Sequence, residues 1–468
     1  MAPCIINRKY FAIGRHSDKG QIMMHTQGVD MTHGPLSRKI WLMAIPLALT
    51  GVIQQFFNAA DIAMIGRFVD EQSMAAVGGC APLITTLLSL FIGLSIGTNV
   101  VLAGFIGQDK SDKVRDGVHT SVTMAFLCGL ALTLIGEMAA RPMLLWLQVP
   151  AEIMDIAEIY LRILFLEQPF LLLYNFESSI FRAVGDTRTP LLALALGGIC
   201  KILLNLVILL VFHGGAGGVA IGSIVANLIS ALFLLWRLHR TDSMLHVNFH
   251  QLTMHRDIVR RILKIGLPAG LQGIVFCLSN LIIQTALNNL GPDVMAGSAA
   301  GYNIEIFVYF MMYAMAQVNT TVVGQNYGAR ELSRCRKATR ICFKQTAILS
   351  VVLIAFVLLF ADPLLHLFTT NDTVIAYGKV RLHCVVCFEW LNAILDLYAG
   401  SLRGYGNSLI PAIISLIGIC GVRITWVYTA FPLFPTLQTL MLCYPASWAV
   451  TDVVLAGVYH LYIRQLGK

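Results

Sequence analysis

The chain alternates long apolar runs with short polar segments. A helix needs about 20 apolar residues to cross a bilayer, and twelve runs of at least that length can be marked along the chain. They lie near residues 40–66, 74–106, 117–140, 153–182, 190–212, 216–237, 259–289, 295–327, 340–360, 374–403, 409–430 and 438–463. The pattern therefore predicts an all-α polytopic membrane protein with twelve transmembrane helices.

A polar phrase that follows the fourth run returns after the tenth. In the stretch IFRAVGDTRTP, it consists of Arg182, Gly185 and Pro190, and each residue type recurs 221 residues later. The recurring residues are Arg403, Gly406 and Pro411. In each copy we expect the arginine to end one span, the glycine to permit a break, and the proline to start the next helix.

The same offset, within one residue, relates other positions of the two halves. The matching pairs are Gly107 and Gly328, Pro46 and Pro268, Gly51 and Gly273, and Asn58 and Asn280. The chain is thus predicted to be two copies of a six-span unit. Because six is even, both copies enter the membrane from the same side, which predicts a parallel 6+6 repeat of two six-helix bundles around a central cleft.

These runs divide the chain into four parts. We expect a flexible cytoplasmic extension over 1–39, a first six-helix lobe over 40–237, a cytoplasmic linker over 238–258 and a second lobe over 259–468. The extension lacks the apolar core of a cleavable signal peptide. The linker is rich in histidine, but the spacing of its histidines matches no zinc-ligand template, so a linker is favoured over a metal site. Those histidines are His239, His246, His250 and His255.

Composition supports the membrane class. Only 12 % of the residues are charged and 57 % are hydrophobic, whereas soluble domains carry about 25 % charged residues. The eleven cysteines include a Cys384-x-x-Cys387 pair without a second ligand pair, so helix packing is favoured over redox or metal chemistry. This composition excludes a single soluble core.

The basic residues predict the orientation. With the N-terminus in the cytoplasm, most Lys and Arg residues fall in cytoplasmic segments or beside them. The positive-inside rule then predicts that both termini are cytoplasmic, and we expect the protein in the plasma (inner) membrane. The main basic residues assigned to the outer loops are Arg67, Arg141, Lys379 and Arg381. This distribution explains the net charge of +8 without a nucleic-acid partner.

Asp61 leads the candidate functional residues, because an ionisable group at membrane depth is costly unless it is paired or hydrated. Gln54, Asn58 and Asp61 follow each other at spacings of four and three, which places them on one face of the first span. A carboxylate flanked by amides can accept a proton or a cation. The alternative is a hydrated carboxylate near the outer rim.

The repeat and two motifs resemble the multidrug and toxic compound extrusion (MATE) family of secondary exporters. The motifs are FRAVGDTRTP after the fourth span and VVGQNYGA after the eighth, and the resemblance covers residues 31–468. The major facilitator superfamily also has 6+6 helices, but its acidic-basic signature is not found in GQDKSDKVRDG between the second and third spans. The resemblance implies an antiporter that uses a cation gradient.

The resemblance also implies a cation-coupling site in the first lobe. Asp61 matches the first-span aspartate of the family, and Gln54 matches a cleft glutamine of some members. Members with a sodium site add an asparagine and an aspartate in the fifth span, where this chain has Lys201 and Asn205, and a threonine in the sixth, where it has Ser223. An ammonium would occupy the place of sodium, so we expect an Asp61–Lys201 pair and favour protons over Na⁺. The alternative is that Lys201 extends its amine to the membrane surface.

The second lobe offers another polar face. Glu389, Asp396 and Arg403 are spaced by seven in the tenth span, and Glu305 lies in the eighth. In the family's second-lobe sodium site, the resemblance places Phe276 and Asn392, so that site looks absent. We expect the acids Glu305, Glu389 and Asp396, with Asn392 beside them, to bind a cationic substrate or to relay protons, with buried structural pairs as the alternative.

The sequence therefore predicts an antiporter that exports organic, drug-like cations in exchange for protons or Na⁺. No Walker lysine motif or nucleophile–base constellation indicates an enzyme, and we expect no cofactor, no metal, and a monomer in the bilayer. The alternatives are a flippase for lipid-linked oligosaccharides, for which Lys201 and Arg423 are the only hints, an exporter of one metabolite, and a channel or structural membrane protein.

Overall fold

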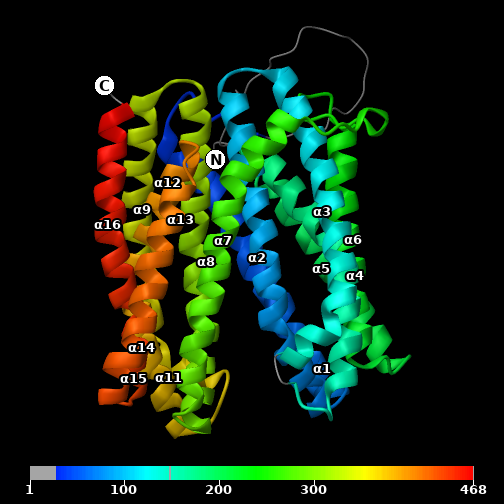
Figure 1. Ribbon diagram of the computed structural model, residues 1–468, viewed down its shortest axis with the longest axis vertical. Helices are drawn as coiled ribbons and strands as arrows, with labels where there is room; N and C mark the ends of the chain where they lie inside the picture. The colour runs from blue at the N-terminus through cyan, green and yellow to red at the C-terminus, as the bar shows by residue number, and fades with distance from the viewer. Residues whose placement is uncertain (1–27, 147–148, 467–468) are drawn as a thin grey trace, which may run out of the picture.

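A computed structural model describes residues 28–146 and 149–466, and the part it describes is built from helices without a strand (Figure 1). The N-lobe comprises α1 (Leu36–Phe68), α2 (Glu71–Gly107), α3 (Ser111–Trp146), α4 (Met154–Ala183), α5 (Arg188–Leu210) and α6 (Gly215–Arg240). The short helix η1 (Phe249–Gln251) follows in the connection between the lobes. The C-lobe comprises α7 (Arg256–Asn288), α8 (Pro292–Gly328), α9 (Leu332–Leu359), α10 (Ala361–His366), α11 (Asp372–Val385), η2 (Val386–Phe388), α12 (Glu389–Gly404), α13 (Leu409–Ser415), η3 (Leu416–Gly421), α14 (Val422–Leu433), α15 (Leu437–Met441) and α16 (Cys443–Leu466).

The prediction of twelve spans in two sets of six is confirmed. Eleven segments of the described chain are long and apolar enough to cross a membrane, and α4 lies beside them as the twelfth long helix (Figure 1). Several charged residues reduce the hydropathy of α4. The tenth span differs from a plain helix, because the 3₁₀ turn η2 separates α11 from α12 immediately before Glu389.

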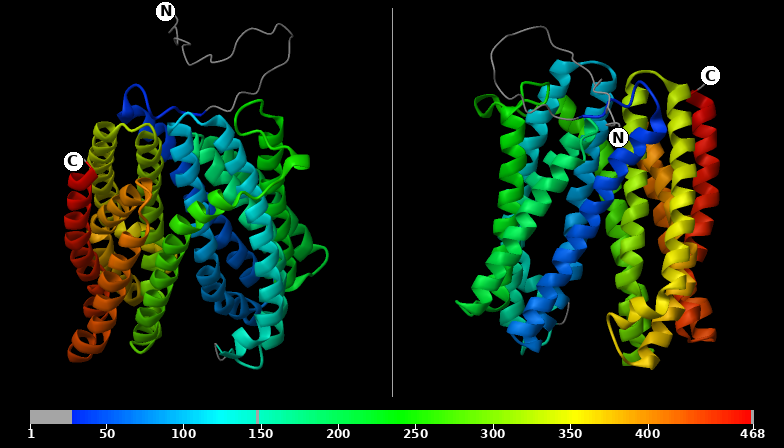
Figure 2. Two further views of the ribbon diagram at one scale, coloured as in Figure 1. Left: turned by 45° about the horizontal axis from the view of Figure 1, so that its top comes forward. Right: turned by 180° about the vertical axis from the view of Figure 1, so that it is seen from behind.

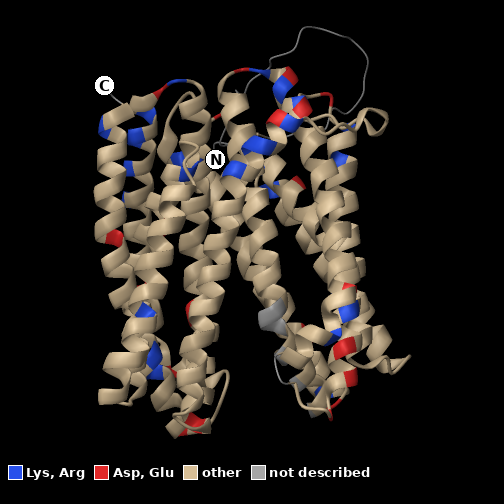
Figure 3. Ribbon diagram, in the orientation of Figure 1, with Lys and Arg blue, Asp and Glu red and all other residues tan. Residues whose placement is uncertain are grey.

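The start of α1 and the end of α16 lie at one end of the bundle, here named the terminal end (Figure 2). The helices of the two lobes come together towards this end and diverge towards the opposite one (Figure 1). Lys and Arg residues gather towards the terminal end (Figure 3).

The interface between the lobes follows the repeat. α1 packs on α8, its counterpart α7 packs on α2, and α2 packs on α8. Gly93 and Gly97 of α2 face Gly266 and Gly270 of α7, where a Cβ at Gly93 would overlap the backbone nitrogen of Gly270. Small residues four apart on both helices allow their backbones to approach this closely.

The first helix of each lobe also enters the core of the other lobe. Ile258 and Ile262, near the start of α7, are buried among N-lobe side chains. Leu36 and Ile40, at the start of α1, are buried in a cluster with side chains of α8, α9 and α12. The two lobes are therefore connected by exchanged helix ends as well as by their facing surfaces.

The repeated polar phrase forms the same turn in both lobes. Gly185 has φ +84° and Gly406 has φ +85°, the left-handed conformation that glycine adopts without strain. The amides of Gly185 and Gly406 donate to the carbonyls three residues earlier, at 2.9 and 2.8 Å. The amides of Asp186 and Asn407 donate to the carbonyls five residues earlier, which completes a Schellman helix end.

The next helix begins within the same phrase. The Asp186 carboxylate accepts hydrogen bonds from the amides of Arg188 and Thr189 at 3.0 Å, which caps α5. Pro190 and Pro411 lie in the first turns of α5 and α13, where an amide hydrogen has no helical acceptor. The phrase thus ends one helix and starts the next, as its residue types predict.

Two segments differ from the sequence-based expectation. Residues 28–35 of the expected flexible extension pack against the bundle, residues 36–39 already belong to α1, and the rest of that prediction falls on residues outside the described part. Between the lobes, α6 continues to Arg240 before the linker, which is attached to α3 where the Asn248 amide donates to His119 Nε2 at 3.0 Å. Within the described residues, no group of three His, Cys, Asp or Glu side chains could hold a metal ion.

Candidate functional site

A close approach of α1 and α5 creates the N-lobe site. A Cβ at Gly198 would overlap the Phe57 ring, so glycine is what lets Phe57 lie against the α5 backbone. Asp61 follows one turn after Phe57, and Lys201 follows one turn after Gly198. Packing at the glycine therefore brings the carboxylate and the ammonium to the same level of the bundle.

Asp61 is held by two donors of α5. Its Oδ2 lies 2.5 Å from Lys201 Nζ, and its Oδ1 accepts a hydrogen bond from Asn205 Nδ2 at 3.1 Å. The side chains of Asp61 and Lys201 are 14 % and 11 % exposed, and Asn205 is fully buried. A Cβ at Gly222 of α6 would overlap Asn205 Oδ1, so Gly222 provides the space for the amide.

Burial makes this ion pair sensitive to any change in the charge of either partner. Removing two charges from water is costly, and the pair is stable only while both partners are present with good geometry. Protonation of Asp61 would cancel one charge and weaken its hold on Lys201, whereas a metal cation at Asp61 would be repelled by the ammonium 2.5 Å away. Asp61 can therefore either bind a proton or form an ion pair with Lys201.

Glu167 is a functional candidate that the sequence analysis missed. This α4 carboxylate is 6 % exposed and accepts a hydrogen bond from Asn227 Nδ2 of α6 at 2.5 Å. It also interacts electrostatically with Lys201 and Asp61. The signal was present, because Glu167 is an ionisable residue within an apolar run, the criterion that selected Asp61.

The structure does not bring the other predicted N-lobe residues to Asp61. Gln54 and Asn58 are exposed, and Asn58 donates to Gln55 Oε1 at 3.0 Å. The Ser223 hydroxyl donates to the Val219 carbonyl of its own helix at 3.5 Å. Among the described contacts, none of these three side chains bonds to Asp61, because Asp61 points towards α5.

In the C-lobe, Glu305 forms a closed ion pair. Arg381 Nε lies 2.9 Å from Glu305 Oε2, and its Nη1 donates to Ser298 Oγ at 2.8 Å. The Arg381 guanidinium also lies over the rings of Tyr302 and Tyr444. The assignment of Arg381 to an outer loop is therefore wrong. Arg381 is buried in α11, where it neutralises Glu305, as the alternative of a buried structural pair predicts.

The acids of α12 are buried without an ion pair among the described residues. Glu389 accepts a hydrogen bond from Asn392 at 2.7 Å, one turn further along the helix. Arg403 donates to Gln272 Oε1 of α7 at 2.7 Å instead of pairing with Asp396. Asp452 of α16, which the sequence analysis did not select, interacts electrostatically with Asp396, and its two carboxylate oxygens are buried without a partner in the described chain.

Arg423 is another buried charge of the C-lobe. It is 2 % exposed and donates to Ser447, Ser279 and Asn280. Its guanidinium lies 4.4 Å from the centre of the Tyr444 ring. No carboxylate of the described chain forms a salt bridge with it.

A doubled six-helix bundle with ionisable groups buried at membrane depth in both lobes defines a polytopic membrane transporter. The chain belongs to the MatE family, whose model matches residues 46–207 and, a second time, residues 268–429. The resemblance to MATE exporters is thus confirmed, and each match covers most of one six-helix repeat.

Individual relatives agree with this assignment. The chain is 26 % identical to the probable multidrug resistance protein YoeA of Bacillus subtilis, over 90 % of this chain and 93 % of the relative. It is 24 % identical to the probable multidrug resistance protein NorM of Thermotoga maritima, over 92 % and 93 % of the two chains. A relative described as an FAD transporter of Shewanella oneidensis is 23 % identical, over 82 % and 86 %.

Solved structures share the fold. A crystal structure of MATE in complex with MaL6 superposes with a TM-score of 0.88 at 21 % identity, over 95 % of this chain and all of the other. The twelve-helix arrangement is therefore that of the known MATE transporters.

Proposed function

We propose that the protein is a secondary antiporter that exports organic compounds from the cytoplasm, with protons as the favoured coupling ion and Na⁺ as the alternative. The observation that carries the proposal is the buried Asp61–Lys201–Asn205 cluster of the N-lobe. One carboxylate with an ammonium on one side and an amide on the other suits a proton better than a metal cation. No cofactor is needed for this chemistry.

The position of α1 connects the site to the movement of the lobes. Its first half packs in the C-lobe core, and its second half is held to α5 through Asp61. When Asp61 takes a proton, the ion pair to Lys201 is lost and the second half of α1 is free to shift relative to α5. Because the first half contacts α8, that shift alters the contact between the lobes, which alternating access requires.

The basic terminal end supports the proposed orientation. Lys and Arg gather towards this end (Figure 3), and the positive-inside rule then favours cytoplasmic termini and insertion in the inner membrane. Substrate would leave towards the opposite end, where the lobes diverge. We propose a monomer as the working unit, since each chain holds both repeats.

Efflux of ethidium from vesicles that contain the purified protein tests this proposal. We expect efflux with an imposed proton gradient, little with a sodium gradient, and at least about a tenfold loss in Asp61→Asn, because the amide cannot take up the proton. Asp362→Asn is the matched control, since the Asp362 side chain is 57 % exposed in the Lys379–Asp362 pair. Sodium-driven efflux that persists without a proton gradient would contradict proton coupling.

An exporter of a single anionic metabolite is the second candidate. The FAD transporter relative and the buried Arg423 guanidinium support it, since Arg423 interacts electrostatically with Glu389 but forms no salt bridge within the described residues. Flavin adenine dinucleotide is therefore the second probe for the same vesicles. Transport of the dinucleotide without ethidium efflux, and its loss in Arg423→Gln, would favour this candidate. If the protein transports neither ethidium nor flavin adenine dinucleotide, a flippase for lipid-linked oligosaccharides becomes the favoured function.

A further inference from the structure

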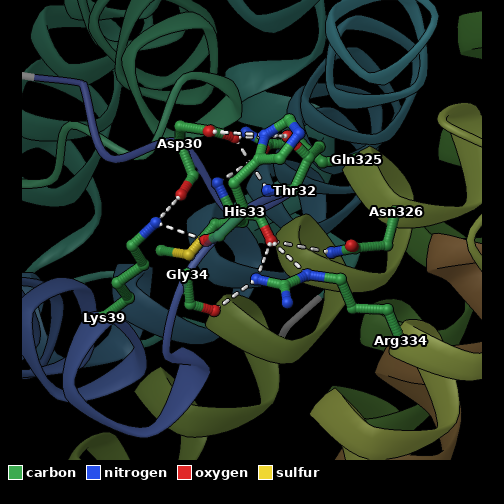
Figure 4. Close-up of polar contacts among 9 residues, drawn as sticks. Asp30, Thr32, His33, Gly34, Lys39, Gln325, Asn326 and Arg334 are labelled. Atoms are coloured by element: carbon green, nitrogen blue, oxygen red, sulfur yellow. Dashed lines mark hydrogen bonds and ion pairs between the residues drawn. The ribbon is translucent and has the colours of Figure 1, made fainter. Parts of the chain in front are cut away.

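Residues 28–35, here named the strap, precede α1 and lie across the terminal end of the bundle (Figure 4). The Met31 amide donates to Gln325 Oε1 of α8 at 3.1 Å, and its carbonyl accepts from Asn326 Nδ2 at 3.2 Å. Arg334 of α9 donates to the same carbonyl at 3.1 Å and to the Gly34 carbonyl at 2.8 Å. These bonds attach the strap to the C-lobe.

The side chain of Met31 adds an apolar anchor. It is 0 % exposed and belongs to the cluster that contains Met315, Val318 and Val322 of α8. Complete burial of a methionine side chain stabilises such a contact, because it removes apolar surface from water. The strap is thus held at one point by both backbone hydrogen bonds and apolar packing.

The other face of the strap contacts the repeated turn of the N-lobe. A Cβ at Gly28 would lie 2.8 Å from the Val184 carbonyl oxygen, and a Cβ at Gly185 would lie 2.5 Å from the Val29 carbonyl oxygen. Gln325, which accepts from Met31, also donates to the Ala183 carbonyl at 2.6 Å. One glutamine therefore joins the strap, the C-lobe helix α8 and the N-lobe turn.

The strap is organised by its own side chains. The Asp30 carboxylate accepts hydrogen bonds from the Thr32 amide and hydroxyl, at 2.8 and 2.5 Å, and lies 3.0 Å from His33 Nδ1. Lys39 of α1 donates to the Asp30 and His33 carbonyls (Figure 4). Partial burial works against the ionised form of Asp30, but these hydrogen bonds and the Lys39 charge outweigh it and lower the pKa of Asp30 below its ordinary 3.8.

The equivalent turn of the C-lobe has no such cover. A Cβ at Gly406 would meet nothing within 4 Å, although its turn has the same backbone conformation as the turn at Gly185. Among the described residues, only one of the two repeated turns is therefore covered by a strap. The C-lobe turn thus forms without a strap, so a strap is not needed to form this type of turn. What the strap adds at the N-lobe turn is a contact between the two lobes.

We propose that the strap is a latch that holds the two lobes together at the terminal end, and that it must release before α8 separates from the N-lobe turn there. The inference rests on the alternating access proposed above, since only that motion separates the two surfaces. The strap contacts both surfaces at once, so its bonds to one of them break when the lobes part.

Two point variants of the full chain release the latch from opposite sides. Arg334→Ala removes the side chain that binds the Met31 and Gly34 carbonyls, and its control is Arg336→Ala, an exposed residue of the same helix. Gly185→Ala places a methyl group against the Val29 carbonyl. Its control is Gly406→Ala, which has the same left-handed φ and no neighbour. Each control carries the same chemical change without contact to the strap.

Two readouts separate release of the strap from separation of the lobes, and neither depends on transport. Hydrogen exchange of residues 28–35 reports on the strap. Labelling of Ala103→Cys by a maleimide reports on the lobes, because Ala103 is 0 % exposed and its Cβ lies 3.2 Å from a Cβ placed at Gly324 of α8. Native cysteines are quantified separately by site-resolved mass spectrometry.

We expect both rates to rise at least about fivefold in Arg334→Ala and Gly185→Ala, and to stay near the parent value in the two controls. Faster exchange of the strap without faster labelling at position 103 would overturn the latch. Unchanged exchange of the strap in both variants would also overturn it, because the contacts would not hold the strap. If the parent protein transports neither ethidium nor flavin adenine dinucleotide, the proposed function is contradicted. The exchange and labelling rates would still test the latch, because neither depends on transport.

Discussion

Replacing Lys201 with methionine is expected to destabilise the protein by about 3 kcal/mol, because breaking a buried ion pair leaves a charge without compensation. Asp61 is 14 % exposed and would keep only the Asn205 hydrogen bond. The double variant Asp61→Asn/Lys201→Met is expected to recover most of the stability, since neither charge remains. The measurement is the thermal unfolding midpoint of the purified protein in detergent, taken through the full double-mutant cycle.

An exposed pair provides the control for this cycle. Lys379 and Asp362 lie 2.6 Å apart, but their side chains are 38 % and 57 % exposed, and exposed pairs contribute about 0–1 kcal/mol. Lys379→Met should therefore change the midpoint much less than Lys201→Met. Equal effects of the two substitutions, or a double variant no more stable than Lys201→Met alone, would contradict a buried and coupled Asp61–Lys201 pair.

A leucine at Gly93 is expected to prevent correct packing of the lobes. Its Cβ would overlap the backbone of Gly270, and backbone atoms cannot turn aside as a flexible side chain can. α2 and α7 must then separate, which also disturbs the N-lobe core around Ile262. Overpacking typically costs about 1–3 kcal/mol and occasionally more. Because backbone atoms are displaced here, we expect the upper end of this range and most of the protein to elute as aggregate on gel filtration.

Gly78→Leu is the control for this prediction, because Gly78 lies on the same helix and a Cβ there would meet nothing within 4 Å. The control should elute as a single species with a midpoint close to that of the parent. If Gly93→Leu also elutes as a single stable species, the close packing of α2 on α7 at this glycine is contradicted.

The sequence by itself was sufficient for the parts of the protein that depend on local pattern. Apolar runs indicated the number of spans, because a segment inside lipid must satisfy its own backbone hydrogen-bonding groups and therefore forms a helix. The offset of 221 residues between Arg182 and Arg403 identified the repeat. Glycine and proline chemistry predicted the turn at Gly185 and Gly406, which both adopt φ near +85°.

The candidate site was accessible only in part. Asp61 was selected because a lone carboxylate in an apolar span is costly, and Lys201 was selected through the family resemblance. Glu167 satisfied the same criterion as Asp61 but was overlooked. Gln54 and Asn58 share a helix face with Asp61 in an idealised projection, yet the structure turns Asp61 to α5 and leaves them exposed.

Apart from the Asp61–Lys201 pair, which the family resemblance indicated, only the tertiary structure decided which buried charges meet. The sequence pattern assigned Arg381 to an outer loop, but helix packing buries it beside Glu305, 76 residues earlier. The strap is a similar case, because Met31 bonds to Gln325 across 294 residues. Hydropathy and spacing describe one helix at a time, whereas these contacts depend on how helices rotate and cross. Local pattern therefore determined the spans, the repeat and the turns of this protein, and packing between distant helices determined its ion pairs and the junction of its lobes.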